Sequence, residues 1–433
     1  HFHYVLCLSE AKGMNIIMLV KIILLILFFG CMIAVGLYAR KSANSMTDFV
    51  LGGRSVGPWL SAFAYGTSYF SAVVFVGYAG QFGWKYGLAS TWIGLGNAVI
   101  GSLLAWVAMG RRTRVMTHHL EVATMPDFFG KRYDSNILRV VASAIAFVFM
   151  IPYTASVYNG LSRLFGMAFD IPYTVCVVTM AVLTGVYVIL GGYMATAIND
   201  FIQGIIMLFG IVAVIGAVLS GQGGFIEAVR KLSELPSDVP VTLGQQGAFA
   251  SFFGTDPLNL LGVIILTSLG TWGLPQMVHK FYAIKSEKAI KTGTIVSTFF
   301  AVIVSGGCYF LGGFGRLFDA PELYKADGSI MYDAIIPAML STLPDILIGI
   351  VIILVLSASM STLSSLVLTS ASTLTLDFIK GNIVKDMDDK KQLIYIRVLI
   401  VFFIVVSVVL ALNPPTFIAQ LMGCLLYTSD AAD

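Results

Sequence analysis

The stretch that decides the fold is SASMSTLSSLVLTSASTLT, residues 357–375, which directly follows the apolar run 348–356. It carries eleven Ser and Thr hydroxyls and no charge, inside a segment long and apolar enough to cross a membrane. A hard monovalent cation is bound by several neutral oxygens rather than by a cage of carboxylates. The stretch therefore predicts a membrane helix that supplies ligands to such a cation.

The composition of the whole chain supports an all-α, polytopic membrane protein. Apolar residues make up 58% of the sequence and charged residues 11%, and the mean hydropathy is +0.88. Only helices or closed barrels satisfy their backbone groups in hydrocarbon, and the long apolar runs do not alternate as barrel strands do. The net charge of +3 gives no reason to expect a nucleic-acid partner. The five cysteines have no metal-binding spacing and predict no disulfide framework.

A span-length window along the chain predicts ten membrane helices. We expect them at 15–38, 58–84, 88–110, 136–160, 172–192, 196–219, 257–280, 290–314, 344–376 and 393–412. With the loop after the first helix placed in the cytoplasm, the inner loops hold 18 Lys and Arg, including Lys280, and the outer loops hold six. This excess predicts a multi-pass protein of the bacterial cytoplasmic membrane, with the amino terminus outside. His279 is expected in an inner loop, without ligand partners.

Both ends of the chain look foreign to the fold. Residues 1–13 precede Met14 and end in EAKG, whose codons are purine-rich as in a ribosome-binding site, so we expect an untranslated leader there. Residues 424–433, CLLYTSDAAD, resemble a translated sequencing adapter. The transport domain is therefore expected at 14–423 and is expected to be incomplete. A fragment of this kind should not transport, and residues 424–433 should pack poorly.

Two of the expected helices are interrupted by helix-weakening residues. The helix at 58–84 contains four glycines, and the helix at 257–280 contains three glycines and Pro275. One such helix would indicate only a kink or close packing. A pair five places apart in the order of helices, and therefore of opposite orientation, indicates inverted repeats with a binding site near the middle of the membrane.

Four motifs in this order resemble the sodium:solute symporter family. They are TDFVLGGRSVGPWLSAFAYGTSYFSA (47–72), GGYMATAINDFIQG (191–204), GLPQ (273–276) and SASMSTLSS (357–365). Within the family the chain looks most similar to the sodium/pantothenate and monocarboxylate branch, through VLGGRS (50–55), INDFIQGIIMLFG (198–210) and NPPTFIAQLM (413–422). The resemblance implies a leucine-transporter-like fold, with two inverted five-helix repeats after one extra helix. On that map the chain stops before the last core helix.

Five positions are candidate sodium ligands. Thr67 and Phe70 flank the expected break in the second helix, where carbonyls lose their helical partners. Ala358, Ser361 and Thr362 have i, i+3, i+4 spacing and share one helix face. All five match the sodium ligands implied by the family resemblance. The alternative is that each hydroxyl bonds to its own i−4 carbonyl or joins neighbouring helices.

Asp200 is an acid at the mouth of a predicted helix, in the GGYMATAIND motif. Acids in or beside membrane spans mark ion pathways, and the family resemblance implies a role on the cytoplasmic exit of the cation. An ordinary first-turn acid that complements the helix dipole is an equal alternative.

The substrate prediction is a small organic acid. Ala72 and the four apolar residues that follow it would offer a sugar few partners. A compact carboxylate could bind the free amides of a broken helix. The residues expected near it are Tyr69, Ser71, Ser268, Thr271 and Trp272. The family's proline carriers have an acid where Tyr69 stands, which disfavours proline here.

These observations predict a sodium-coupled symporter that imports a small organic acid such as pantothenate or a monocarboxylate by alternating access. Two alternatives remain open: a proline or amino-acid symporter, and the membrane sensory module of a signalling kinase. An enzyme is not expected, because no catalytic constellation lies at membrane depth.

Overall fold

The computed structural model describes residues 2–169, 172–380, 382–384 and 386–413. This part of the chain is helical, and its extended segments pair only at isolated bridges. The helices are α1 (Phe2–Ala39), α2 (Met46–Leu51), α3 (Pro58–Tyr69), α4 (Ala79–Tyr86), α5 (Thr91–Gly96), α6 (Arg111–His119), α7 (Met125–Arg132), α8 (Asn136–Phe169), α9 (Tyr173–Gly221), α10 (Phe225–Glu234), α11 (Pro257–Leu269), α12 (Pro275–Ala283), α13 (Glu287–Gly312), α14 (Tyr332–Ser341), α15 (Asp345–Thr373) and α16 (Asp389–Leu412). Residues 424–433 lie outside the described part.

Each of the ten expected spans has a helix in the structure. Seven helices of the described part are long and apolar enough to cross a membrane, and α9 is one of them. Its 49 residues would measure about 74 Å if straight, more than twice the hydrocarbon thickness. Gly192 divides it, because its backbone (φ 55°, ψ −147°) is open to glycine but strained for other residues. The two parts of α9 correspond to the expected helices at 172–192 and 196–219.

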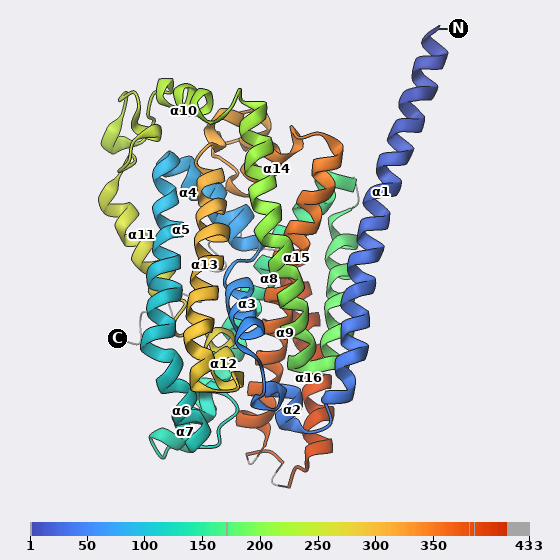
Figure 1. Cartoon of the computed structure of the whole chain (residues 1–433), viewed down its shortest axis with the longest axis vertical. Coiled ribbons are helices and arrows are strands. Elements are labelled where there is room, and N and C mark those ends of the chain that lie inside the picture. Colours follow the sequence, from blue (N-terminus) through green and yellow to red (C-terminus); the bar gives the residue numbers. More distant parts are fainter. Residues whose placement is uncertain (1, 170–171, 381, 385, 414–433) are drawn as a thin grey trace.

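The connections between the helices gather at the two ends of the bundle (Figure 1). Short helices α2, α6 and α7 lie at one end, and α10 and α14 lie at the other. The first group belongs to loops expected in the cytoplasm, and the second to loops expected outside. Helix α1 begins at Phe2, inside the expected leader, and its first turns project past the other helices in Figure 1.

Both interrupted helices are broken where the sequence predicts. Helix α3 ends at Tyr69, and Phe70 has extended backbone angles (φ −106°, ψ 94°). The helix restarts after Ser71, whose side-chain oxygen accepts a hydrogen bond from the Val73 amide at 3.2 Å. Helix α11 ends at Leu269, and α12 begins with Pro275, which lacks an amide hydrogen and therefore suits a first turn.

Candidate functional site

The predicted cation ligands of α3 and α15 meet in the buried core. The Ser361 hydroxyl oxygen lies 3.1 Å from the Thr67 carbonyl oxygen and 3.2 Å from that of Ala358. The Thr362 hydroxyl oxygen lies 3.4 Å from the Thr67 carbonyl and 3.2 Å from the Ala358 carbonyl. Four of the five predicted oxygens therefore form one cluster between two helices that are almost 300 residues apart in the sequence.

The spacing of these oxygens is wider than an ordinary hydroxyl bond. Hydroxyl-to-oxygen hydrogen bonds are commonly about 2.7 to 2.8 Å long. On the same helix, Ser359 bonds the Val355 carbonyl at 2.7 Å, whereas Ser361 and Thr362 reach the Thr67 carbonyl at 3.1 and 3.4 Å. Neutral oxygens at this spacing, in a core shielded from water, are suitable ligands for a sodium ion placed between them.

Phe70, the fifth predicted ligand, borders the same place. It ends α3, and with Ser71 and Ala358 it lines a small cavity that extends to Leu354 on α15 and Val304 on α13. The cavity measures about 10 Å³, close to the smallest space that holds one water molecule. Of the five predicted positions, Phe70 and Ala358 line this cavity, and the Ala358 carbonyl also belongs to the oxygen cluster with Thr67, Ser361 and Thr362.

Other hydroxyls of α15 follow the alternative predicted for them. Ser359 and Ser372 donate to carbonyls one turn earlier, at 2.7 and 2.6 Å. Ser370 donates to the Met150 sulfur of α8 at 2.8 Å. These hydroxyls are used within the helix or against α8, whereas Ser361, Thr362 and Ser365 contact α3 at Thr67 and Ser68, just before its break.

Four of the five predicted substrate residues gather beside the break between α11 and α12. Tyr69 donates its hydroxyl to the Thr267 carbonyl at 2.7 Å, and Thr271 donates to the Ser268 carbonyl at 2.8 Å. The Trp272 indole donates to the Ile100 carbonyl at 3.0 Å. Ser71 instead lines the small cavity beside Phe70 and Ala358.

The region around these predicted substrate residues is closely packed. A Cβ built on Gly101 would lie 2.4 Å from the Tyr69 hydroxyl oxygen, so the ring is pressed against the neighbouring backbone. Sequence reasoning missed Asn97, whose side-chain oxygen accepts from both Thr267 and Ser268 at 3.0 Å. Asn97 is the one amide side chain in the otherwise apolar run around it, and this is the sequence feature that could have identified it.

Asp200 is fully buried, and its partner is Lys280. The Lys280 ammonium lies 3.6 Å from the nearer Asp200 oxygen, and both side chains are almost completely shielded from solvent. The expectation that Lys280 and His279 lie in an inner loop is wrong, because α12 carries both into the core. The expected span 257–280 ends at Lys280, so the charge of Lys280 was counted with the cytoplasmic loop that follows. Without Lys280, the inner loops still hold more Lys and Arg residues than the outer loops.

Asp377 is a second buried acid that the sequence analysis did not single out. It lies in a π-helical turn (Leu374–Ile379) that continues α15, and Thr124 donates its hydroxyl to it at 2.6 Å. The expected helix ends at residue 376, so Asp377 fell in the loop that was expected to follow it.

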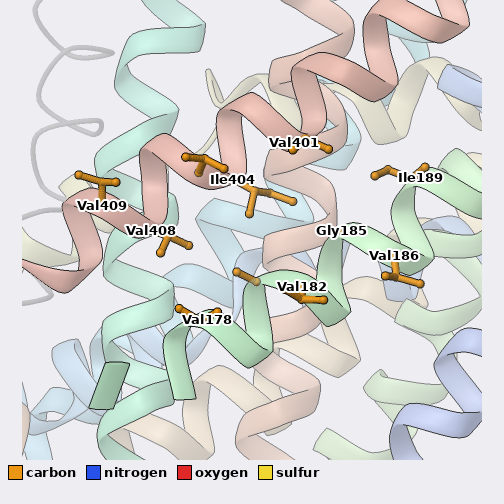
Figure 2. Close-up of a pocket in the computed structure, with 11 residues that line it drawn as sticks. Val178, Val182, Gly185, Val186, Ile189, Val401, Ile404, Val408 and Val409 are labelled. Carbon is orange, nitrogen blue, oxygen red and sulfur yellow. The ribbon is translucent and has the colours of Figure 1, made fainter. Parts of the chain in front are cut away.

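A more open cavity lies between the first part of α9 and α16, with a volume of about 380 Å³ (Figure 2). Figure 2 shows valine and isoleucine side chains along both helices, among them Val178, Val182, Val401 and Ile404. Its lining offers aliphatic side chains and one glycine, and hence no side-chain group that could bind a charged substrate. It is therefore no candidate for the substrate site.

Comparison with known proteins decides the family. The model of the sodium:solute symporter family matches residues 49–431 of this chain. The chain belongs to the sodium:solute symporter family. Among similar proteins, the osmoregulated proline transporter OpuE of Bacillus subtilis is 28% identical over 93% of this chain and 80% of its own length. Sodium/proline symporter 2 of Staphylococcus saprophyticus is 29% identical over 93% of this chain and 77% of its own length.

Solved structures agree on the fold. A sodium-coupled sialic acid symporter, in a substrate-bound outward-open state, aligns with a TM-score of 0.77 at 17% identity, over 94% of this chain and 84% of its own. A nucleobase-cation-symport-1 family transporter in a closed conformation aligns with a TM-score of 0.54 at 13% identity, over 89% of this chain and 78% of its own. The expected leucine-transporter-like fold is confirmed.

Membership of the family establishes a sodium-coupled solute symporter with sodium as its coupling ion. The narrower expectation of the pantothenate and monocarboxylate branch is not supported, since the similar proteins named above are proline transporters. For the VLGGRS and INDFIQG motifs, the comparisons show the family and not that branch.

Proposed function

We propose that this symporter imports a small amino acid of the proline type, driven by sodium bound at Thr67, Phe70, Ala358, Ser361 and Thr362. The observation that carries the proposed sodium site is the cluster of neutral oxygens between α3 and α15, set wider than ordinary hydroxyl bonds. A cation held there joins a broken helix to an unbroken one. Sodium binding therefore favours the conformation in which the two helices touch.

The second broken helix supplies the other half of the proposed site. Residues 270–274 connect α11 to α12, and Thr271 and Trp272 lie within this connection. Amides freed at such a break bind a carboxylate, which both an amino acid and an organic acid carry. Tyr69 and Ser268 lie beside the break and are proposed to contact the body of the substrate.

The choice of a proline-type substrate over an organic acid follows the similar proteins, which are named as proline transporters. Tyr69 is the feature that opposes it, because a neutral phenol replaces the acid implied for the family's proline carriers. The buried Asn97 and Ser268 pair offers a neutral polar contact close to the same place. Pantothenate or a monocarboxylate is the second candidate, favoured by the absence of that acid.

The driving force is sufficient for concentrative uptake. One sodium ion moving down a membrane potential of 100 mV releases about 2.3 kcal/mol. That energy corresponds to a roughly fiftyfold accumulation, since about 1.4 kcal/mol is a factor of ten.

The proposed sodium site is tested by substitution on α15. Ser361→Ala and Thr362→Ala remove hydroxyl oxygens and barely change helix propensity, so we expect the protein to fold. The sodium concentration for half-maximal uptake should rise at least about tenfold, the lower end of what lost metal-site partners cost. Apparent substrate affinity should fall with it, because linkage between two sites is reciprocal.

Ser359→Ala is the matched control. Ser359 is equally buried on the same helix, but its hydroxyl bonds only the preceding turn. It should leave the sodium dependence unchanged. Sodium dependence equal to wild type in the Ser361 and Thr362 variants would refute the site.

The substrate is tested by uptake into proteoliposomes under a sodium gradient, with potassium replacing sodium as the control. Labelled proline, pantothenate, pyruvate and acetate are compared. We expect sodium-dependent uptake of proline, blocked by excess unlabelled proline. Uptake of an organic acid alone would select the second candidate, and uptake of neither class would reject both.

A further inference from the structure

The Lys280 ammonium lies at the meeting point of four helices. It is 3.6 Å from an Asp200 oxygen on α9, and it donates a hydrogen bond to the Ser365 hydroxyl on α15 at 2.9 Å. The Ser365 hydroxyl lies 2.9 Å from that of Ser68 on α3. The nitrogen also lies 5.2 Å from the centre of the Tyr193 ring. A single cation thus contacts or bridges α3, α9, α12 and α15.

This group is adjacent to the proposed sodium site. Ser68 follows Thr67 directly, and its carbonyl lies 3.5 Å from the Thr362 hydroxyl. Ser365 lies one turn beyond Ser361 and Thr362 along α15, toward the end where Thr124 binds Asp377. Figure 1 shows α12 at the end of the bundle that carries α6 and α7. Lys280 therefore lies between the sodium site and the end with the basic loops.

The ion pair is loose, which leaves the carboxylate able to bind another cation. Direct ammonium-to-carboxylate hydrogen bonds are about 2.7 to 2.9 Å long, shorter than the 3.6 Å here. Within the described residues, neither Asp200 oxygen accepts a hydrogen bond at normal geometry. A buried carboxylate in that situation is costly to keep charged without a cation close by.

We propose that the Lys280 ammonium is a tethered cation on the inner side of the sodium pathway, competing with sodium for Asp200 and Ser365. This inference rests on the sodium site proposed above. While the ammonium stays in place, sodium is repelled from the carboxylate and remains among the Thr67, Ser361 and Thr362 oxygens. Sodium leaves toward the basic loops when α12 moves and takes the ammonium with it. Lys280 is then a positioning residue for ion release.

The proposal predicts that removing the ammonium creates a stronger cation site. In Lys280→Met, the Asp200 carboxylate and the Ser68 and Ser365 hydroxyls become free to bind sodium. Binding of radiolabelled sodium to the purified full-length protein should tighten at least about fivefold, the lower end of typical coupling between sites. Sodium-driven uptake should fall in kcat more than in substrate KM, because release becomes slow.

Three further variants separate competition from a purely structural role. Lys280→Arg keeps the charge and should bind sodium as the wild type does. Lys280→Met combined with Asp200→Asn removes both charges and should return sodium affinity to near the wild-type value. Lys288→Met removes an exposed lysine at the start of α13 and should change nothing.

If Lys280→Met does not fold, Lys280→Gln replaces it, since a neutral amide can still bond both Asp200 and Ser365. The same tightening is expected. Unchanged or weaker sodium binding in a folded neutral variant would overturn the proposal, as would failure of every neutral variant to fold while Lys280→Arg folds. Failure of the sodium site itself is distinguishable, because Ser361→Ala and Thr362→Ala would then leave sodium binding unchanged whatever Lys280 does.

Discussion

At the scale of single residues, neighbouring hydroxyls on α15 differ in the helices that they contact. Ser359 and Ser361 are two residues apart on α15, and both are fully buried. Ser359 bonds only its own helix, at 2.7 Å, whereas Ser361 contacts both the Ala358 carbonyl of its own helix at 3.2 Å and the Thr67 carbonyl of α3 at 3.1 Å. Side chains two positions apart point to different sides of a helix, so only one faces the break.

Asp200 leads to a prediction about rate rather than affinity. Asp200→Asn removes the charge next to Lys280 but keeps the shape of the side chain. If the acid serves ion release, kcat for uptake should fall while substrate KM changes little. Asp327→Asn, in an exposed loop, should change neither value. A rise in KM with kcat unchanged would assign Asp200 to binding instead.

At the scale of elements, the inner bundle depends on glycines where helices cross. A Cβ built on Gly83 of α4 would lie 2.0 Å from the Gly312 carbonyl oxygen, and one built on Gly312 of α13 would lie 2.1 Å from the Ala79 carbonyl oxygen. Small residues let two membrane helices approach this closely. The second half of the broken helix, α4, is thereby fixed against α13.

Gly312→Ala should therefore destabilise the protein, because the methyl group meets backbone that cannot move aside easily. Overpacking of this kind costs about 1 to 3 kcal/mol. The measurement is the thermal unfolding midpoint in detergent. Gly216→Ala is the control, since no atom lies within 4 Å of its added Cβ and alanine favours the helix. An equal midpoint for both variants would contradict the packing argument.

At the scale of the whole molecule, the loops rich in Lys and Arg and the sparsely charged loops lie at opposite ends of the helix bundle. The loops with most Lys and Arg share one end with α2, α6 and α7, and the sparsely charged loops share the other with α10 and α14. The positive-inside rule predicts that the α6 and α7 end lies in the cytoplasm and that the amino terminus lies outside.

This orientation is tested with single cysteines in a background that lacks the five native ones. Ala326→Cys, exposed in the loop before α14, should react with a membrane-impermeant maleimide in intact cells. Arg132→Cys, exposed at the end of α7, should react only after the membrane is permeabilised. The reverse pattern would invert the predicted topology.

The sequence by itself determined the helical membrane class, the presence of a helix in each of the ten expected spans, and the two breaks, and it predicted the five candidate oxygens. Hydropathy, glycine placement and i, i+4 spacing are local properties, so they can be read along the chain. Only the tertiary structure showed that Lys280 faces Asp200 and Ser365. The same is true of Asn97, whose side-chain oxygen accepts hydrogen bonds from Thr267 and Ser268. These residues are up to 171 positions apart in the sequence. A charged residue at the end of a predicted span gives the same sequence pattern whether its side chain faces water or the protein core. The direction of a side chain on a packed helix is fixed by its neighbours, which come from other parts of the sequence.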